Sequence, residues 1–189
     1  MRTRTLVLAG MVLAVALTRL LPHPPNFTPL GAVALFAGAR FGNKRLAFLV
    51  PLAALFLSDC ALQVITGLGW AGGWLAQGTG FHRGMGVVYG AVALVTALGL
   101  FLPGRRRGPL TVAAGTLAGS TVFFLVTNFA WWPGYDLYPH TPEGLLLSYT
   151  AALPFFGWTL LGDACYATAL FGGLALAEKR FTRLLPAVG

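Results

Sequence analysis

The chain contains 189 residues, of which 57% are hydrophobic, 13% aromatic and 10% charged, and its mean hydropathy is +0.75. Soluble domains carry about a quarter charged residues, so this composition excludes a soluble enzyme or DNA-binding domain and predicts an integral membrane protein. We interpret the formal charge of +8 as a determinant of the protein's orientation in a lipid bilayer, and we expect no nucleic-acid partner. The length predicts a single transmembrane domain over residues 1–189, with room for about six helices of about 20 residues.

Six apolar runs follow one another at about residues 5–21, 29–41, 46–67, 85–103, 109–131 and 154–177. They predict an all-α bundle of about six transmembrane helices. The second run has about 13 residues, which is short for a full span, so we expect it to be tilted, kinked or partly re-entrant. In the last hydrophobic stretch, Pro154 is expected to separate a short interfacial helix, Leu145–Ala152, from the sixth span.

The basic residues predict how the bundle is oriented. Eleven of the 13 lie at the N-terminus, in the second and fourth connections, and at the C-terminus. The opposite connections hold only Arg83 together with the acidic residues Asp136 and Glu143. By the positive-inside rule, both termini are expected to be cytoplasmic. The start of the chain also resembles a signal peptide cut after Ala16, but the apolar run continues to Leu21, which favours an uncut first helix.

Three charged residues fall inside the predicted spans, namely Arg19, Asp59 and Asp163. A charge near the bilayer centre costs several kcal/mol unless it is paired or hydrated. A rise of about 1.5 Å per residue places the two carboxylates roughly 12 Å from the outer surface, with Arg19 at a shallower depth. Either Arg19 pairs with one or both carboxylates to lock the bundle, or the three residues form the polar floor of an outward-facing pocket. Asn128, near the outer end of the fifth helix, would add amide hydrogen bonds.

The outer connections offer candidate caps for such a pocket. Residues 21–29 include four prolines in nine positions, so this segment is stiff, and we expect Asn26 to belong to a cap. Trp131 and Trp132 fit an interfacial aromatic belt, and they would serve equally as a stacking wall for a planar ligand. The glycine-rich residues 67–80 suit either a gate or a simple connector.

The sequence contains no zinc-protease, nucleophile-elbow or phosphate-loop motif. The three histidines, His23, His82 and His140, are isolated in outer loops, so an external metal site is less favoured than solvent exposure. Cys60 and Cys165 lie close to the intramembrane carboxylates and are best interpreted as buried apolar thiols. The alternative is that Cys60 offers a soft sulfur ligand to a cofactor metal such as cobalt.

Small residues four positions apart recur in several predicted helices, and such pairs allow helices to approach closely. Most are expected to pack inside the bundle. Gly10 and Ala14, on the first helix, could instead face a partner subunit. The other pairs are Ala34 with Gly38, Gly86 with Gly90, and Gly115 with Gly119.

Four segments together resemble an uncharacterised family of small bacterial membrane proteins: Arg19–Pro29, Leu57–Asp59, Phe123–Phe129 and Pro154–Asp163. The resemblance covers almost the whole chain. That family is similar in size and architecture to the substrate-binding S-components of energy-coupling factor transporters. The resemblance implies six helices with cytoplasmic termini in the bacterial inner membrane, and an outward-facing pocket for a vitamin-class ligand. Similarity to the solitary cobalamin transporters would make Cys60 the ligand of cobalt.

We therefore expect a non-enzymatic membrane protein that binds a small nutrient and mediates its uptake, with cobalamin as the specific candidate and no required cofactor. Nothing in the sequence hydrolyses ATP, so a coupling subunit and ATPases would be separate chains unless the protein acts alone. Two alternatives remain open: a membrane-embedded enzyme that uses Asp59 and Asp163 as a carboxylate pair with His23 nearby, and a structural scaffold subunit. The expected pocket residues are Arg19, Asn26, Asp59, Asn128 and Asp163.

Overall fold

The computed structural model describes residues 2–21, 23–68, 81–102, 108–134 and 137–181, and within these ranges it contains helices and no strands. The first helix, α1 (Arg2–Leu17), continues into a short 3-10 turn, η1 (Thr18–Leu20). It is followed by α2 (Leu30–Arg40), α3 (Lys44–Gly67), α4 (Met85–Leu100), α5 (Pro109–Gly134) and α6 (Pro142–Ala167). A π-helical turn, η3 (Thr168–Gly172), then joins α6 to the last helix, α7 (Gly173–Arg180).

Each of the six predicted apolar runs forms a helix, but only four of the described helices are long and apolar enough to cross a membrane. The candidate spans are Thr3–Leu20, Lys44–Gly67, Pro109–Gly134 and Pro142–Arg180. The expected six spans therefore become four by length and composition. The reason is that α2 has 11 residues and α4 has 16. At about 1.5 Å per residue, neither covers a hydrocarbon core of about 30 Å.

Helix α6 runs from Pro142 to Ala167 with Pro154 in its interior. The prediction that Pro154 ends a separate helix at residues 145–152 is therefore wrong. A proline removes one N–H from the hydrogen-bond ladder, and the turns on either side keep their own bonds, so a long helix in a membrane tolerates it. Helix α3 contains a similar internal proline, Pro51, at a buried position.

The short helix α2 is the most enclosed element of the bundle. All of its residues from Gly31 to Ala39 are buried, and it packs against α1, α3, α4, α5 and α6. Its crossing with α4 is close because glycines meet there. A Cβ atom added to Gly38 would lie 2.0 Å from the carbonyl oxygen of Thr96, and one added to Gly99 would lie 2.5 Å from that of Leu35. The short second run is thus a central helix that other helices surround.

The remaining small-residue pairs divide into packed and open ones. Gly115 and Gly119 lie against Leu102 and Val95, so this pair packs inside the bundle as expected. By contrast, a Cβ atom added to Gly10, Gly86 or Gly90 would find nothing within 4 Å. The Gly10 face of α1 is therefore open in this structure.

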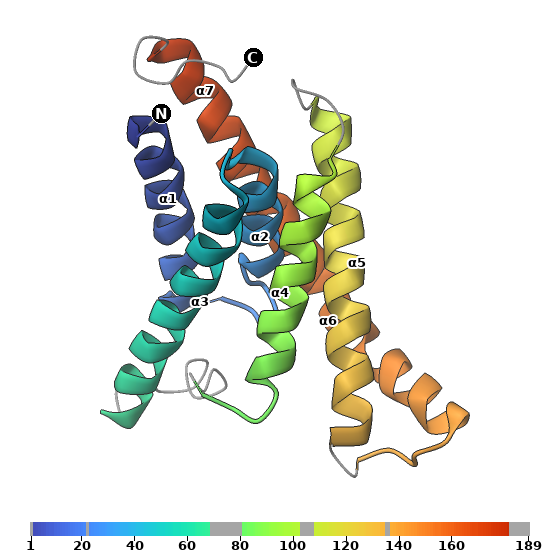
Figure 1. Cartoon of the computed structure of the whole chain (residues 1–189). Helices are drawn as coiled ribbons and strands as arrows, with labels where there is room; N and C mark the ends of the chain where they lie inside the picture. Colours follow the sequence, from blue (N-terminus) through green and yellow to red (C-terminus); the bar gives the residue numbers. More distant parts are fainter. Residues whose placement is uncertain (1, 22, 69–80, 103–107, 135–136, 182–189) are drawn as a thin grey trace.

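Both ends of the described chain lie at the same end of the bundle, together with the connection between α2 and α3 (Figure 1). At that end an ion pair joins α1 to α7, with Nη1 of Arg4 2.7 Å from Oε1 of Glu178. Helix α1 ends and α2 begins at mid-height, whereas α3, α4, α5 and α6 extend further toward the opposite end (Figure 1). Residues 23–29 make the connection between α1 and α2, so they enter the bundle at mid-height.

Candidate functional site

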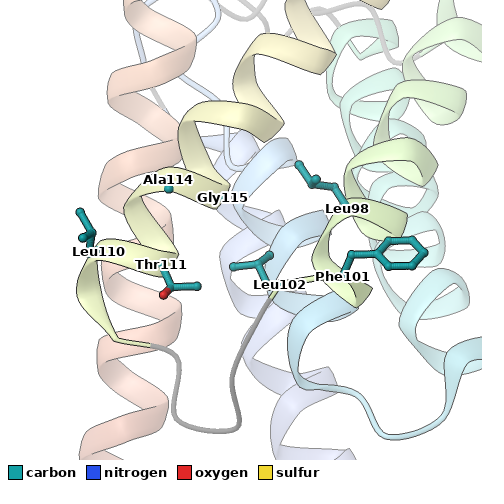
Figure 2. Close-up of a pocket in the computed structure, with 7 residues that line it drawn as sticks. All are labelled: Leu98, Phe101, Leu102, Leu110, Thr111, Ala114 and Gly115. Atoms are coloured by element: carbon teal, nitrogen blue, oxygen red, sulfur yellow. The ribbon is translucent and has the colours of Figure 1, made fainter.

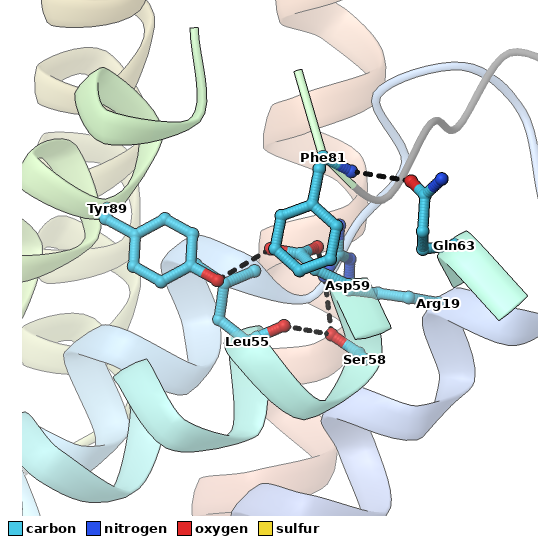
Figure 3. A network of polar contacts seen from close by, with 7 residues as sticks. All are labelled: Arg19, Leu55, Ser58, Asp59, Gln63, Phe81 and Tyr89. Carbon is cyan, nitrogen blue, oxygen red and sulfur yellow. Dashed lines mark hydrogen bonds and ion pairs between the residues drawn. The ribbon is translucent and has the colours of Figure 1, made fainter. Parts of the chain in front are cut away.

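The first buried carboxylate, Asp59, is the centre of a polar network that three elements supply (Figure 3). Nη1 of Arg19, on η1, donates to Oδ1 of Asp59 at 2.7 Å and to Oγ of Ser58 at 2.5 Å. The hydroxyl of Tyr89, on α4, donates to Oδ2 of Asp59 at 2.8 Å. We call Arg19, Ser58, Asp59 and Tyr89 the Asp59 cluster.

The local sequence of α3 explains why two adjacent polar residues point inward. From Ala54 onward, the buried residues of α3 are Ala54, Leu55, Ser58, Asp59 and Leu62, which recur at the spacing of one helical face. The hydroxyl of Ser58 also donates to the carbonyl oxygen of Leu55 at 2.8 Å, which fixes its rotamer. The side chains of Arg19 and Asp59 keep 14% and 6% of their surface exposed, so the arginine side chain is the more accessible partner.

Next to the Asp59 cluster, a side chain of α3 holds the chain that leads into α4. Gln63 lies one turn beyond Asp59, and its Oε1 accepts a hydrogen bond from the backbone N–H of Phe81 at 3.2 Å (Figure 3). The ring of Phe81 packs edge-on against Phe56, with ring centroids 6.1 Å apart. Both rings are about half exposed, so apolar surface is available close to the charged groups.

The second buried carboxylate, Asp163, binds the start of α2. Its Oδ1 accepts the backbone N–H of Ala32 at 2.8 Å, and its Oδ2 accepts the hydroxyl of Ser120 at 2.7 Å. A Cβ atom added to Gly31 would lie 2.3 Å from Oδ2 of Asp163, so only glycine fits at this position. We call Gly31, Ala32, Ser120 and Asp163 the Asp163 cluster.

Asp163 thus acts as an N-terminal cap supplied by another helix. The residue at the cap position of α2 itself is Pro29, which makes no side-chain capping bond. The first turn of a helix presents unsatisfied N–H groups and the positive end of the macrodipole, both of which favour a carboxylate. Because Asp163 is only 2% exposed and accepts hydrogen bonds through both oxygens, its arrangement fits a structural role at the start of α2.

The structure pairs Arg19 with Asp59 and gives Asp163 different partners. The two expected amide residues lie apart from both clusters in their described hydrogen bonds. Asn128 donates through Nδ2 to the carbonyl oxygen of Phe124 on its own helix, at 2.8 Å. Asn26 is exposed in the connection before α2 and has a positive φ of 64°, which asparagine tolerates better than most residues.

The expectation that both cysteines are buried is wrong. Cys60 is half-buried beside the Asp59 cluster, and Cys165 is exposed. Among the described residues, no three His, Cys, Asp or Glu side chains come together as a metal site. His140 instead packs edge-on against Trp132. Residues 69–80 of the glycine-rich connection, which was expected to form a gate or a simple connector, lie outside the described residues.

An apolar groove of about 350 Å³ lies elsewhere, between the C-terminal end of α4 and the N-terminal end of α5 (Figure 2). Leu98 lies nine positions after Tyr89 on α4, which is about 14 Å along the helix axis. The groove is therefore distinct from the Asp59 cluster. Its lining residues are Leu98, Phe101, Leu102, Leu110, Thr111, Ala114 and Gly115.

Comparison with known families adds one finding. A model of a family of unknown function, DUF6580, matches residues 1–186. The chain belongs to the DUF6580 family. No curated protein and no solved structure matches it significantly.

The polar residues of this DUF6580 protein that the sequence analysis missed are Ser58, Tyr89 and Ser120, together with the backbone groups at the start of α2. Ser58 could have been found, because it directly precedes an intramembrane carboxylate. For α2, the signal was the lack of a Ser, Thr, Asp or Asn at its cap position, which indicates a cap from elsewhere. No local signal marked Tyr89 or Ser120.

Proposed function

We propose that this DUF6580 protein is a substrate-binding membrane protein that mediates the uptake of a small nutrient, and that the nutrient binds at the Asp59 cluster. The observation that carries the proposal is the ion pair of Arg19 with Asp59 inside an apolar helical bundle. Ionisable residues within membrane-spanning segments are costly, and they commonly mark pathways for substrates or ions.

The difference in exposure between the two carboxylate clusters supports this choice of site. The two carboxylates are both buried, at 4% exposure for Asp59 and 2% for Asp163, but the partners of Asp163 are buried as well, whereas Arg19 and Tyr89 are only half-buried. Gln63 and Phe81, next to the Asp59 cluster, are exposed. A solute would therefore reach the Asp59 cluster without opening the packing around α2.

The direction of transport follows from the charges. The end of the bundle that carries both chain ends also carries basic residues of α1, α3 and α7, among them Arg4, Lys44 and Lys179. By the positive-inside rule this end is cytoplasmic in a multi-pass protein of the bacterial inner membrane. The Asp59 cluster, about two thirds of the way along α3 from that end, then lies in the outer half. A site there would capture solutes from outside.

The chain offers one place for a coupling partner. The open Gly10 face of α1, which includes Ala14, allows another helix to approach closely. A separate coupling subunit with its ATPases would dock there if uptake is energised in this way. If the protein acts alone, this face contacts only lipid.

Cobalamin is the specific nutrient that we would test first, because half-buried Cys60 directly follows Asp59 and offers a thiolate to cobalt. The test is the visible spectrum of purified protein with added cobalamin. A change in the cobalt bands that Cys60→Ala abolishes and Cys165→Ala preserves would support this ligand. An unchanged spectrum would exclude cobalamin as the ligand, and a different nutrient would then have to be identified.

The experiment on the proposed function is to purify the protein in mild detergent and to identify co-purified small molecules by mass spectrometry. We expect a small molecule to co-purify with the wild-type protein in a stoichiometric amount and to be lost from the Asp59→Asn variant. The matched control is Glu178→Gln, which breaks a second described ion pair, also 2.7 Å long, at the opposite end of α1. This variant should keep the solute.

Circular dichroism and thermal unfolding would show that both variants remain folded. A wild-type protein that carries no solute and takes up none in proteoliposomes would contradict the proposal. A solute that turns over in the presence of the wild-type protein would indicate a membrane enzyme. In that case the carboxylates act separately, because the described contacts of Asp59 and Asp163 share no partner.

A further inference from the structure

We propose that the nutrient carries an anionic group, a carboxylate or a phosphate, and that Arg19 binds this group through Nε and Nη2. This inference rests on the proposed function and specifies the chemical class of its substrate. It follows from the donors and acceptors that the Asp59 cluster leaves open, and from the charges around it.

The first observation is the use that Arg19 makes of its donors. A guanidinium has five N–H groups in a planar fork. The described contacts of Arg19 involve Nη1 alone, which donates to Ser58 and Asp59. Within the described ranges, Nε and Nη2 have no acceptor. Neither atom is among the buried nitrogens that lack a partner, so both keep some accessible surface. These two nitrogens form the edge that binds a carboxylate or phosphate through two parallel hydrogen bonds.

The second observation is that Asp59 is less open to a ligand than Arg19. Its Oδ1 is bound by Arg19 and its Oδ2 by the Tyr89 hydroxyl, and only 6% of its side chain is exposed. A cationic ligand would have to displace one of these donors. An anionic ligand adds to the free edge of Arg19 and leaves the bonds of Asp59 in place.

The third observation is the balance of charge. Arg83 is exposed two residues after Phe81, whose backbone is bound to Gln63 at the edge of the Asp59 cluster. In the outer half of η1, α3 and the turn before α4, the described charged groups are two guanidinium groups and the single carboxylate of Asp59, while the other described outer carboxylates, Glu143 and Asp163, lie on α6. A local excess of positive charge of this kind attracts anions and repels cations. The exposed rings of Phe56 and Phe81 suit an apolar or aromatic body on the same solute.

The test uses benzoate and inorganic phosphate as anionic probes, with benzamide as the neutral control of the same shape as benzoate. We expect benzoate or phosphate to raise the thermal unfolding temperature of the purified protein, and benzamide to have no effect. Arg19→Lys keeps the charge and the pairing with Asp59 but removes the fork, so it should weaken binding of the effective probe about tenfold. Arg4→Gln, which breaks the ion pair at the other end of α1, should bind the probe as the wild type does.

Two results would overturn the inference: equal stabilisation by benzamide and benzoate, or probe binding that Arg19→Lys leaves unchanged. The co-purified solute separates this failure from failure of the proposed function. A neutral or cationic solute that Asp59→Asn loses would overturn the anionic class and leave the uptake function intact. The absence of any solute, together with no binding of either anionic probe, would overturn both.

Discussion

The two buried carboxylates of the bundle accept hydrogen bonds in the same pattern but from different partners. Asp59 and Asp163 each accept hydrogen bonds through both oxygens at 2.7–2.8 Å, and each uses one hydroxyl donor. The remaining partner of Asp59 is the flexible side chain of Arg19. The remaining partner of Asp163 is the backbone at the start of α2. The role of an intramembrane charge is therefore indicated by its partner rather than by its depth in the membrane.

A side-chain partner can move, whereas a helix terminus cannot move without its helix. Arg19 can turn its free donors toward a solute while it remains bound to Asp59. The N–H of Ala32 is fixed because α2 is surrounded by other helices. We therefore expect substitutions in the Asp163 cluster to act mainly on the free energy of unfolding. Substitutions in the Asp59 cluster should act mainly on binding.

The largest expected effect is that of Asp163→Ala, which should lower the free energy of unfolding by about 3 kcal/mol. It removes the cap of α2 and leaves the buried N–H of Ala32 and the hydroxyl of Ser120 without their acceptor. The measurement is unfolding in mixed detergent micelles, followed by circular dichroism. Asp163→Asn is the control, because it keeps one acceptor oxygen and should lose only part of this energy. A loss below about 1 kcal/mol for Asp163→Ala would mean that the cap is dispensable.

Gly31→Ala tests the same contact from the helix side. The added Cβ would lie 2.3 Å from Oδ2 of Asp163, so the carboxylate or the start of α2 has to shift. We expect a loss of about 2 kcal/mol in the same unfolding assay. Gly10→Ala is the matched control, since its Cβ meets nothing within 4 Å. If both variants unfold alike, the close approach of Gly31 to Asp163 does not constrain the fold.

The helices were largely predictable because apolar runs, bounded by prolines, glycines and basic residues, determine where a chain can be helical in a membrane. The depth of Arg19, Asp59 and Asp163 was also accessible from residue counting. Their directions around each helix axis were not. Asp163 binds a backbone group 131 positions away in the sequence. Because a backbone N–H is not specific to one residue type, the sequence does not mark this partner. The partner of Arg19 was left open for the same reason, since two carboxylates of similar depth were available.

The ion pair itself should show a moderate coupling energy. A double-mutant cycle with Arg19→Gln, Asp59→Asn and the double variant isolates the interaction of the two side chains. We expect a coupling of about 1.5 kcal/mol in the free energy of unfolding, because each single variant leaves the other charge without its partner. The neutral double variant should therefore be more stable than the sum of the single losses predicts. A coupling near zero would show that Arg19 and Asp59 do not depend on each other in solution, and the same cycle on Arg4 and Glu178 provides the reference.

Removing one hydroxyl donor at each carboxylate compares the two clusters directly, and it includes the smallest expected effect, that of Tyr89→Phe. Ser120→Ala should cost about 1.5 kcal/mol, because Ser120 is fully buried and no water can replace its bond to Asp163. Tyr89→Phe should cost about 0.5 kcal/mol, since Tyr89 is only half-buried and water can take the place of its hydroxyl at Asp59. Unfolding of the two variants under identical conditions gives the comparison directly. If Tyr89→Phe proves to be the more costly change, the Asp59 cluster is the more tightly sealed of the two, and its assignment as the solute-accessible site would have to be exchanged with that of the Asp163 cluster.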